Sequence, residues 1–398
     1  MIKPELLAPA GDLEKCHIAL LYGADAVYVG GQSYSLRARA SNFSLADIEA
    51  AVTMAHAMGK KLYVTVNMIP YEADLEGLKE YLQTLESLQV DAIIAAATSV
   101  IRIAQAYTRL PIHLSTQQST TNHLALNYWA GQGLERVVLG REVSLDELRE
   151  LTSVAQAELE VFIHGGMCVS YSGKCTLSNT MTGRDANRGG CAHSCRWDYE
   201  LIQAGTQLES APSFSMSAKD LETVKFISAL IDCGIHSLKI EGRIKSIHYI
   251  ATVVNTYRRL IDALCDDIEV DLPTYVLNIK KAENRLTSHG FMAGLTTLNE
   301  QLFNARSESP TQNFIGIIKA YNSETQMATL EQRNKFAVGD VIEVFSPHAD
   351  SLTFVLEELW DETHTKIQDA SHPKATVYAK IPFECEPYAL LRKVNLKD

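Results

Sequence analysis

The sequence lacks any apolar run long enough to span a membrane, and its first residues, MIKPELLAPAGD, reach an acidic side chain at Glu5. A transmembrane helix needs about 20 apolar residues, and a secretory leader carries a basic segment followed by an apolar one. Both are excluded, so we expect a cytoplasmic protein without a membrane partner. Low-complexity tracts are also missing, and no repeat is visible beyond a strand–helix unit.

Positive charge is scarce, because the 398 residues carry a formal net charge of -12 at pH 7. Proteins that coat nucleic acid non-specifically need an excess of Lys and Arg, so this class is excluded, although a local basic site is not. Hydrophobic residues make up 46% and charged residues 21%, which is typical of a globular protein with a full core. The length predicts one large domain and a smaller one.

Eight short apolar runs recur in the first part of the chain, with amphipathic stretches such as 44–59, 75–90 and 144–157 between most of them. The runs are 5–11, 26–31, 61–67, 92–97, 112–117, 136–140, 159–165 and 237–243. Ser44 and Ser144 each precede an acidic residue by three positions, which is the capping-box pattern of a helix start.

This alternation predicts an α/β fold, a TIM-like (β/α)8 barrel over residues 1–300. About seventy residues separate the seventh run from the eighth, so we expect an insertion after strand 7, at about 166–215. From Phe314 onward short strands alternate with turns, which predicts a small β-barrel accessory domain at 310–398.

Polar residues stand at the ends of the predicted strands, where the active sites of such barrels form. They are Asn67, Gln117, Arg141, His164, Glu241 and Arg243. For each of them alone, a strand cap or a turn is the alternative interpretation. Their convergence on one end of the barrel favours a functional site.

Four cysteines lie close together in the insertion, at Cys168, Cys175, Cys191 and Cys195, separated by six, fifteen and three residues. Four thiolates in a glycine-rich loop are typical ligands of an iron–sulfur cluster, and we predict one here. A structural zinc site is the alternative, but zinc sites usually pair ligands two to four residues apart. Four unliganded thiols in one polar loop are disfavoured. With four ligands the cluster would be saturated and suited to electron transfer.

Protease motifs are missing, since the sequence has neither HExxH nor GxSxG. Ser170 or Ser172 with His193 could be imagined as nucleophile and base, but such a pair would dismantle the metal site. A non-catalytic RNA-binding or assembly protein, with the cluster as a staple, is a further alternative.

The stretch ELEVFIHGGMCVSYSGKCTLSN (158–179) resembles the signature of peptidase family U32, with support from TMTGRDANRGGCAHSCRW (180–197) and SLKIEGRIKS (237–246). The resemblance covers about the first 300 residues, and the tail is similar to the family's C-terminal barrel. Although the family is named for collagen degradation, members resemble O2-independent hydroxylases of the tRNA wobble uridine, of a ribosomal RNA cytidine, or of ubiquinone precursors. The four cysteines match the family's cluster ligands.

The tRNA branch resembles this chain best, and the resemblance implies an iron–sulfur-dependent, prephenate-linked formation of 5-hydroxyuridine with a [4Fe-4S] cluster. The partners implied are tRNA and a family paralogue. Hydroxylation of rRNA or of a quinone precursor, and a collagenase-like peptidase activity, are the alternatives.

Under the hydroxylase hypothesis we expect His164 and Glu241 to transfer protons. Lys239, Arg243 and Lys245 would hold phosphate or the carboxylates of prephenate, with Arg184, Arg188 and Arg196 adding charge. Asn67, Gln117 and Arg141 complete the predicted substrate-binding set. The alternative for the segment EGRIKS is a solvated charged turn before a helix.

Overall fold

The computed structural model describes residues 2–36, 42–203, 206–207, 213–282, 285–302 and 313–394. The chain divides into two compact units, Met1–Ser309 and Pro310–Asp398. No helix in the described ranges combines the length and the apolar character needed to cross a membrane.

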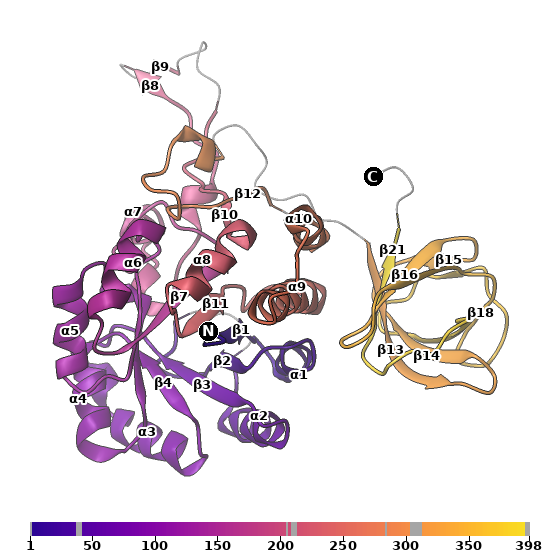
Figure 1. Ribbon diagram of the computed structural model, residues 1–398, viewed down its shortest axis with the longest axis horizontal. Helices are drawn as coiled ribbons and strands as arrows, with labels where there is room; N and C mark the ends of the chain where they lie inside the picture. Colours follow the sequence, from indigo (N-terminus) through magenta and orange to yellow (C-terminus); the bar gives the residue numbers. More distant parts are fainter. Residues whose placement is uncertain are drawn as a thin grey trace. The chain divides into compact units, whose positions relative to one another are not determined.

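Eight parallel strands close into a barrel in the first unit (Figure 1). They are β1 (Glu5–Pro9), β2 (Ala26–Gly30), β3 (Lys61–Val66), β4 (Ala92–Ala95), β5 (Ile112–Leu114), β6 (Arg136–Val138), β7 (Glu158–Gly165) and β11 (Ser237–Ile240). Each strand pairs with the next in this order, and β11 pairs with both β7 and β1, which closes the ring. The predicted barrel is confirmed: seven of its strands fall within one of the eight apolar runs, and β7 begins one residue before its run.

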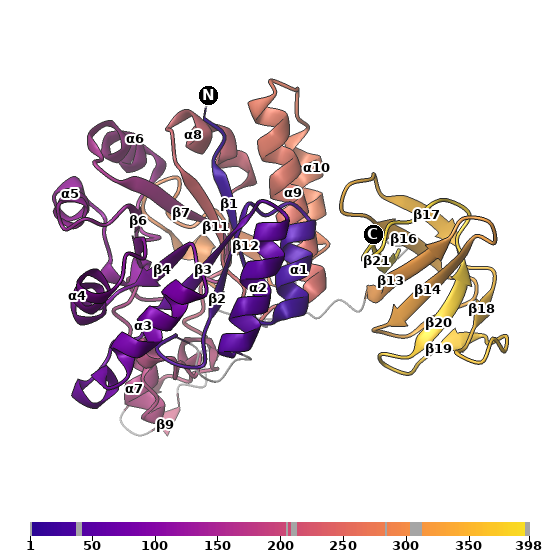
Figure 2. The ribbon, with the colours of Figure 1, turned by 90° about the horizontal axis from the view of Figure 1, so that it is seen from below.

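The strands are apolar throughout because they are covered on both faces, as β2 and β4 show with every residue buried. Helices surround them (Figure 2). The helices are α1 (Leu13–Leu21), α2 (Leu45–Ala57), α3 (Leu78–Ser87), α4 (Thr98–Tyr107), α5 (His123–Gly131), α6 (Leu145–Val154), α8 (Ile227–Asp232), α9 (Ile247–Cys265) and α10 (Leu272–Lys280). Capping boxes begin α2 at Ser44 and α6 at Ser144, as the sequence predicts.

The long connection between β7 and β11 contains the predicted insertion. Its elements are α7 (Leu177–Thr182), 3₁₀-helices at Ala186–Arg188 and Ser194–Arg196, the hairpin β8 (Ile202–Gln203) and β9 (Thr206–Gln207), and β10 (Asp220–Glu222). Figure 2 shows α7 and β9 at the end of the barrel opposite the start of β1. Because the strands are parallel, that end is their carboxyl end. Residues 166–200, which carry the four cysteines, are called the cysteine arm hereafter.

After the arm the chain returns to the barrel through β10, which lies antiparallel to β7 and parallel to β12 (Thr287–Ser288). Arg285 forms a buried ion pair with Asp220, and its Nη2 donates to Ser217 Oγ at 2.9 Å. The segment that follows α10 therefore packs against the chain that returns from the arm to the barrel.

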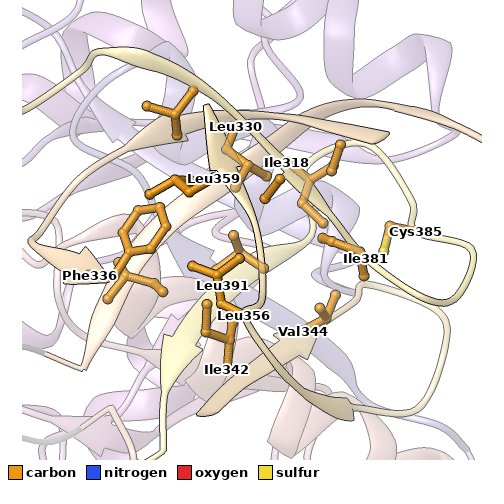
Figure 3. Close-up of a cluster of buried hydrophobic side chains, with 14 of the residues drawn as sticks. Ile318, Leu330, Phe336, Ile342, Val344, Leu356, Leu359, Ile381, Cys385 and Leu391 are labelled. Carbon is orange, nitrogen blue, oxygen red and sulfur yellow. The ribbon is translucent and has the colours of Figure 1, made fainter. Parts of the chain in front are cut away.

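The second unit is an antiparallel half-barrel. Its strands are β13 (Phe314–Asn322), β14 (Met327–Gln332), β15 (Phe336–Ala337), β16 (Val341–Phe345), β17 (Leu352–Val355), β18 (Leu359–Trp360), β19 (Asp369–Ala370), β20 (Thr376–Lys380) and β21 (Leu390–Lys393). Seven of them form one sheet in the order β17-β16-β21-β13-β14-β20-β18. Side chains such as Leu330, Phe336, Ile342 and Leu391 fill its interior (Figure 3). Alternating burial along β14 reflects one covered and one exposed face.

Candidate active site

The four clustered cysteines are free thiols at the mouth of the barrel. Cys168 and Cys191 are exposed, whereas Cys175 and Cys195 are half-buried. Cys168 follows β7, Cys175 precedes α7, and Cys195 lies in the second 3₁₀-helix. The turns of the cysteine arm thus gather residues from both ends of a 28-residue segment.

The four thiols lie close enough for their charges to act on one another. Desolvation raises the pKa of Cys195, the charges of the other three thiols raise it further, and the guanidinium of Arg196 opposes them. Desolvation also raises the pKa of Cys168, although an edge of the residue reaches solvent, and Arg141 opposes this shift. The cations Arg196 and Arg141 therefore lie near the thiols, where deprotonation would concentrate negative charge.

The donor set fits an iron–sulfur cluster by its chemistry, because four adjacent thiols with nearby cations are what such a cluster requires. As placed, the side chains of the described ranges form no group of three or more His, Cys, Asp or Glu residues arranged to hold a metal ion. Ligation would therefore draw the thiols together. Two of the other cysteines, Cys16 and Cys385, are buried singly, and desolvation raises the pKa of each to about 12.

The first half of the cysteine arm rests on the loops that follow β5 and β6. The backbone N–H of Ser172 donates to Glu142 Oε1 at 2.9 Å, and the hydroxyl of Ser119 donates to the carbonyl of Ser172. Gly173 has φ +74, and a Cβ there would lie 2.3 Å from the carbonyl oxygen of Gln117. A side chain at this position would lift the arm off the barrel.

Glu241, Arg141 and Tyr28 form a polar cluster at the carboxyl ends of three strands. Arg141 Nη2 lies 3.7 Å from Glu241 Oε2, and the Tyr28 hydroxyl lies 3.3 Å from the same oxygen and 3.0 Å from the carbonyl of Ile240. The Arg141 guanidinium also covers the ring of Phe162 at 3.9 Å. Glu241 and Arg141 both influence Cys168 electrostatically, so this cluster borders the thiols.

Arg243 and Asn67 lie at the mouth but bind protein groups. Arg243 is 5% exposed, and its guanidinium donates to Ser35 Oγ at 3.1 Å, Thr65 Oγ1 at 3.0 Å and the Leu36 carbonyl at 2.8 Å. Asn67 Oδ1 accepts from the N–H of Leu36 at 3.1 Å. Both residues shape the loop that follows β2.

Lys239 points into the barrel. Its ammonium lies 2.7 Å from Glu160 Oε1, and neither side chain is more than 5% exposed. Arg136 adds a second cation 3.4 Å from Glu160 Oε2 and also pairs with Glu5 at 2.5 Å. The ammonium lies over the ring of Tyr28 at 4.6 Å. These contacts make Lys239 part of a buried ionic network.

His164 is buried against aromatic side chains. Desolvation, and secondarily the charge of Lys245, lowers the pKa of His164 to about 3, so its imidazole is neutral at pH 7. Its Nδ1 lies 3.4 Å from the hydroxyl of Tyr257. Lys245 is more accessible, at 21% side-chain exposure, and lies 3.8 Å from Asp220 Oδ2 and 5.0 Å over the ring of Tyr249.

Gln117 and Arg184 each keep a buried polar atom without a hydrogen-bond partner within the described part of the chain: Gln117 Nε2 and Arg184 Nε. The other amide atom of Gln117, Oε1, accepts from Ser115 at 3.0 Å, and Arg184 Nη2 donates to the carbonyl of Cys191 at 3.3 Å. Unpartnered buried donors are rare in folded proteins, and a bound substrate would satisfy them.

Sequence reasoning missed Tyr28, Glu142 and Glu160. Tyr28 lies in an apolar run that ends in glycine, where its hydroxyl gives no separate signal. Glu142 directly follows a predicted site residue, so its proximity to Arg141 was the available clue. Glu160 is an acidic residue inside an apolar strand, and a buried charge of this kind indicates a buried partner.

Comparison with known proteins agrees with this architecture. The model of peptidase family U32 matches residues 11–301, and that of the peptidase family U32 C-terminal domain matches residues 310–392. "tRNA hydroxylation protein P1" of Bacillus subtilis is 45% identical over 98% of this chain and 95% of its own length. "tRNA hydroxylation protein P" of Escherichia coli is 32% identical over 99% of this chain and 97% of its own length.

A third relative carries a different name. "Collagenase" of Porphyromonas gingivalis is 30% identical over 91% of this chain and 91% of its own length. Relatives that span nearly the whole chain and two family models that cover both structural units lead to one assignment. The chain belongs to peptidase family U32.

Proposed function

We propose that this protein hydroxylates the wobble uridine of tRNA to 5-hydroxyuridine without O2, with a [4Fe-4S] cluster bound by Cys168, Cys175, Cys191 and Cys195. The observation that carries the proposal is that four free thiols of one arm lie at the barrel mouth, within electrostatic reach of one another and of Arg141 and Glu241. Full-length similarity to proteins named for tRNA hydroxylation supports the reaction and the substrate.

Formation of 5-hydroxyuridine removes two electrons from the pyrimidine ring, so an external two-electron acceptor must take part, and a cluster held by the four cysteines would relay the electrons to it one at a time. Glu241 is the proposed proton acceptor for the hydrogen that leaves the ring, because its carboxylate lies at the mouth, 15% exposed, and is oriented by Tyr28 and Arg141. His164 remains a second candidate for proton transfer, and its neutral imidazole could act only as an acceptor at pH 7.

Substrate binding is assigned to Gln117 and Arg184, which each keep a buried donor atom without a partner in the described part of the chain, and to Lys245, whose side chain is 21% exposed. Gln117 Nε2 would donate to a carbonyl of the extruded base, and Arg184 and Lys245 would bind phosphate or a carboxylate. Prephenate, a dicarboxylate, is the proposed cosubstrate at this cationic rim. Asn67, Lys239 and Arg243 would contribute indirectly, since they bind Leu36, Glu160 and the loop after β2.

Binding of tRNA by a chain with a net charge of -12 would depend on a local basic surface. The cysteine arm would supply it through Lys174, Arg184 and Arg196, which lie close to the cysteines in the sequence. A family paralogue is a proposed additional partner.

The test is nucleoside analysis of tRNA from a strain that lacks the gene, complemented with the wild type or with Cys175→Ser. Loss of 5-hydroxyuridine derivatives, restored by the wild type alone, is the expected result. Anaerobically purified protein should contain iron and absorb visible light. Unchanged tRNA with altered rRNA or quinone pools would indicate one of the other hydroxylation substrates instead.

Peptidase activity is the second candidate because of the collagenase-named relative. The geometry favours it less, since the hydroxyl of Ser172 lies 3.3 Å from both carboxylate oxygens of Glu142, and His193 Nδ1 lies 3.2 Å from Arg196. Cleavage of gelatin by iron-free protein, abolished by Ser172→Ala, would favour this candidate.

A further inference from the structure

An ion pair, Asp74–Arg188, joins the second half of the cysteine arm to the barrel. Arg188 Nη1 lies 2.6 Å from Asp74 Oδ2 and Nη2 lies 3.1 Å from Oδ1, so the two side chains meet with two parallel hydrogen bonds. Both are only about a quarter exposed, at 23% and 25%. A two-pronged contact of this kind fixes orientation as well as distance.

The acidic partner, Asp74, is held in place by contacts within its own loop. Asp74 lies in the 3₁₀-helix Glu72–Leu75, in the loop after β3, and its carboxylate accepts from the N–H of Tyr71 at 2.7 Å. The ring of Tyr71 lies 4.1 Å from the Arg188 guanidinium carbon, which adds a cation–π contact. Arg188 and Tyr71 together lower the pKa of Asp74 through hydrogen bonds to its carboxylate.

On the arm side, Arg188 and the backbone next to it make further hydrogen bonds to the barrel loop. Arg188 Nη1 also donates to the carbonyl of Ile69 at 3.2 Å, and the N–H of Ile69 donates to the carbonyl of Asn187 at 3.2 Å. Gly189 has φ +83, which only glycine adopts readily, and it lets the chain turn directly after Arg188. The contact therefore includes one backbone–backbone bond and one side-chain–backbone bond in addition to the ion pair.

Two of the four cysteines are connected to this contact through their carbonyls. Asn187 Nδ2 donates to the carbonyl of Cys175 at 3.3 Å, and Arg184 Nη2 donates to that of Cys191 at 3.3 Å. The N–H of Gly190 donates to the carbonyl of Asp185 at 2.7 Å, which closes the loop that joins Arg184 to Cys191. A continuous chain of bonds thus runs from the β3 loop to the backbone of Cys175 and Cys191.

We propose that Asp74 and Arg188 act as a latch that holds Cys175 and Cys191 in position for the cluster, while Glu142 and Ser172 hold the half of the arm that carries Cys168. The inference rests on the proposed function for the identity of the cluster. Both members of the latch are positioning residues, since neither touches the thiols. Losing the latch should let half of the ligand set move away from the other half.

The experiment compares Asp74→Asn, Arg188→Gln and the conservative Asp74→Glu with the wild type. The matched control is Lys319→Gln, which breaks an ion pair of similar exposure, Lys319–Glu331 at 3.0 Å, in the other structural unit. Bound iron, the visible absorption and EPR spectra, and the rate of bleaching in air are measured on anaerobically purified full-length protein. Melting temperatures show whether each variant folds.

We expect Asp74→Asn and Arg188→Gln to bleach about three- to fivefold faster than the wild type and to hold correspondingly less iron, the range that a partly exposed ion pair can support. Asp74→Glu should recover most of the difference, and Lys319→Gln should match the wild type. Equal iron content and equal bleaching rates in all four variants would overturn the proposal.

A second measurement separates the latch from the cluster. In iron-free protein, maleimide labelling of Cys175 and Cys191, followed by mass spectrometry, should be faster in Asp74→Asn than in the wild type, with Cys385 as the unchanged reference. Equal labelling would refute the latch. If the wild type binds no iron but its thiols show this protection, the latch stands and the proposed function falls.

Discussion

Replacing Lys239 by Met tests whether this residue belongs to the barrel core or to the substrate site. The change removes the cation 2.7 Å from Glu160, whose side chain is fully buried. Breaking a buried ion pair by removing one partner typically costs about 3–5 kcal/mol of the free energy of unfolding. Arg136 remains 3.4 Å from the other carboxylate oxygen, so we expect the lower end, about 3 kcal/mol.

The double variant Lys239→Met with Glu160→Leu provides the control, because it removes both charges together. No carboxylate is then left buried without its partner, and Arg136 keeps Glu5, so the double variant should lose less free energy of unfolding than Lys239→Met alone. The measurement is urea unfolding of the full chain, followed by circular dichroism, with Lys319→Gln as a surface reference.

One result would refute this reasoning. If Lys239 instead binds substrate, Lys239→Met would leave the free energy of unfolding within about 0.5 kcal/mol of the wild type and raise KM, as a surface substitution in a binding site does.

Three further predictions concern the site itself. Cys175→Ser should abolish bound iron and visible absorption, whereas Cys385→Ser should change neither; equal colour in both would contradict the cluster assignment. Glu241→Gln should slow hydroxylation by about 10²- to 10⁴-fold while iron content stays unchanged, and a wild-type rate would exclude a role in proton transfer. Desolvation lowers the pKa of His164 to about 3, below its unfolded value of 6.5, so stability should fall as the pH drops from 6.5 towards 3. His164→Asn should reduce that slope by up to about 1.4 kcal/mol per pH unit, which acid-dependent urea unfolding measures.

At the barrel mouth, a segment with little regular structure of its own is held by the rigid barrel. A cluster needs four thiols from a 28-residue segment, and that segment has only short helices of its own. Its shape therefore depends on contacts with the barrel loops, at Glu142 on one side and at Asp74 on the other. This arrangement explains why glycines such as Gly173 and Gly189 stand where the arm turns or approaches the barrel.

Much of the architecture was predictable because it depends on local patterns. Each apolar run became a barrel strand, and the capping boxes at Ser44 and Ser144 began helices where they were expected. The tail was less predictable, since β17 has four residues of which the apolar Leu352 and Val355 are exposed, and β18 has only two residues, so neither gives a periodic signal. The helix α10 was missed because it is short and follows a charged segment.

The sequence by itself determined the eight-stranded barrel, the position of the insertion and the presence of four closely spaced cysteines in it, because periodicity and close spacing act over a few residues. Only the tertiary structure decided where the charged side chains of the segment KIEGR (239–243) lie and which groups they bind. Strand alternation turns Lys239 inward to Glu160 from the neighbouring strand, Glu241 stays at the mouth with Arg141, and Arg243 is buried against the loop after β2. Those partners are 79, 100 and about 200 residues away in the chain, so only the closed ring of strands brings them together.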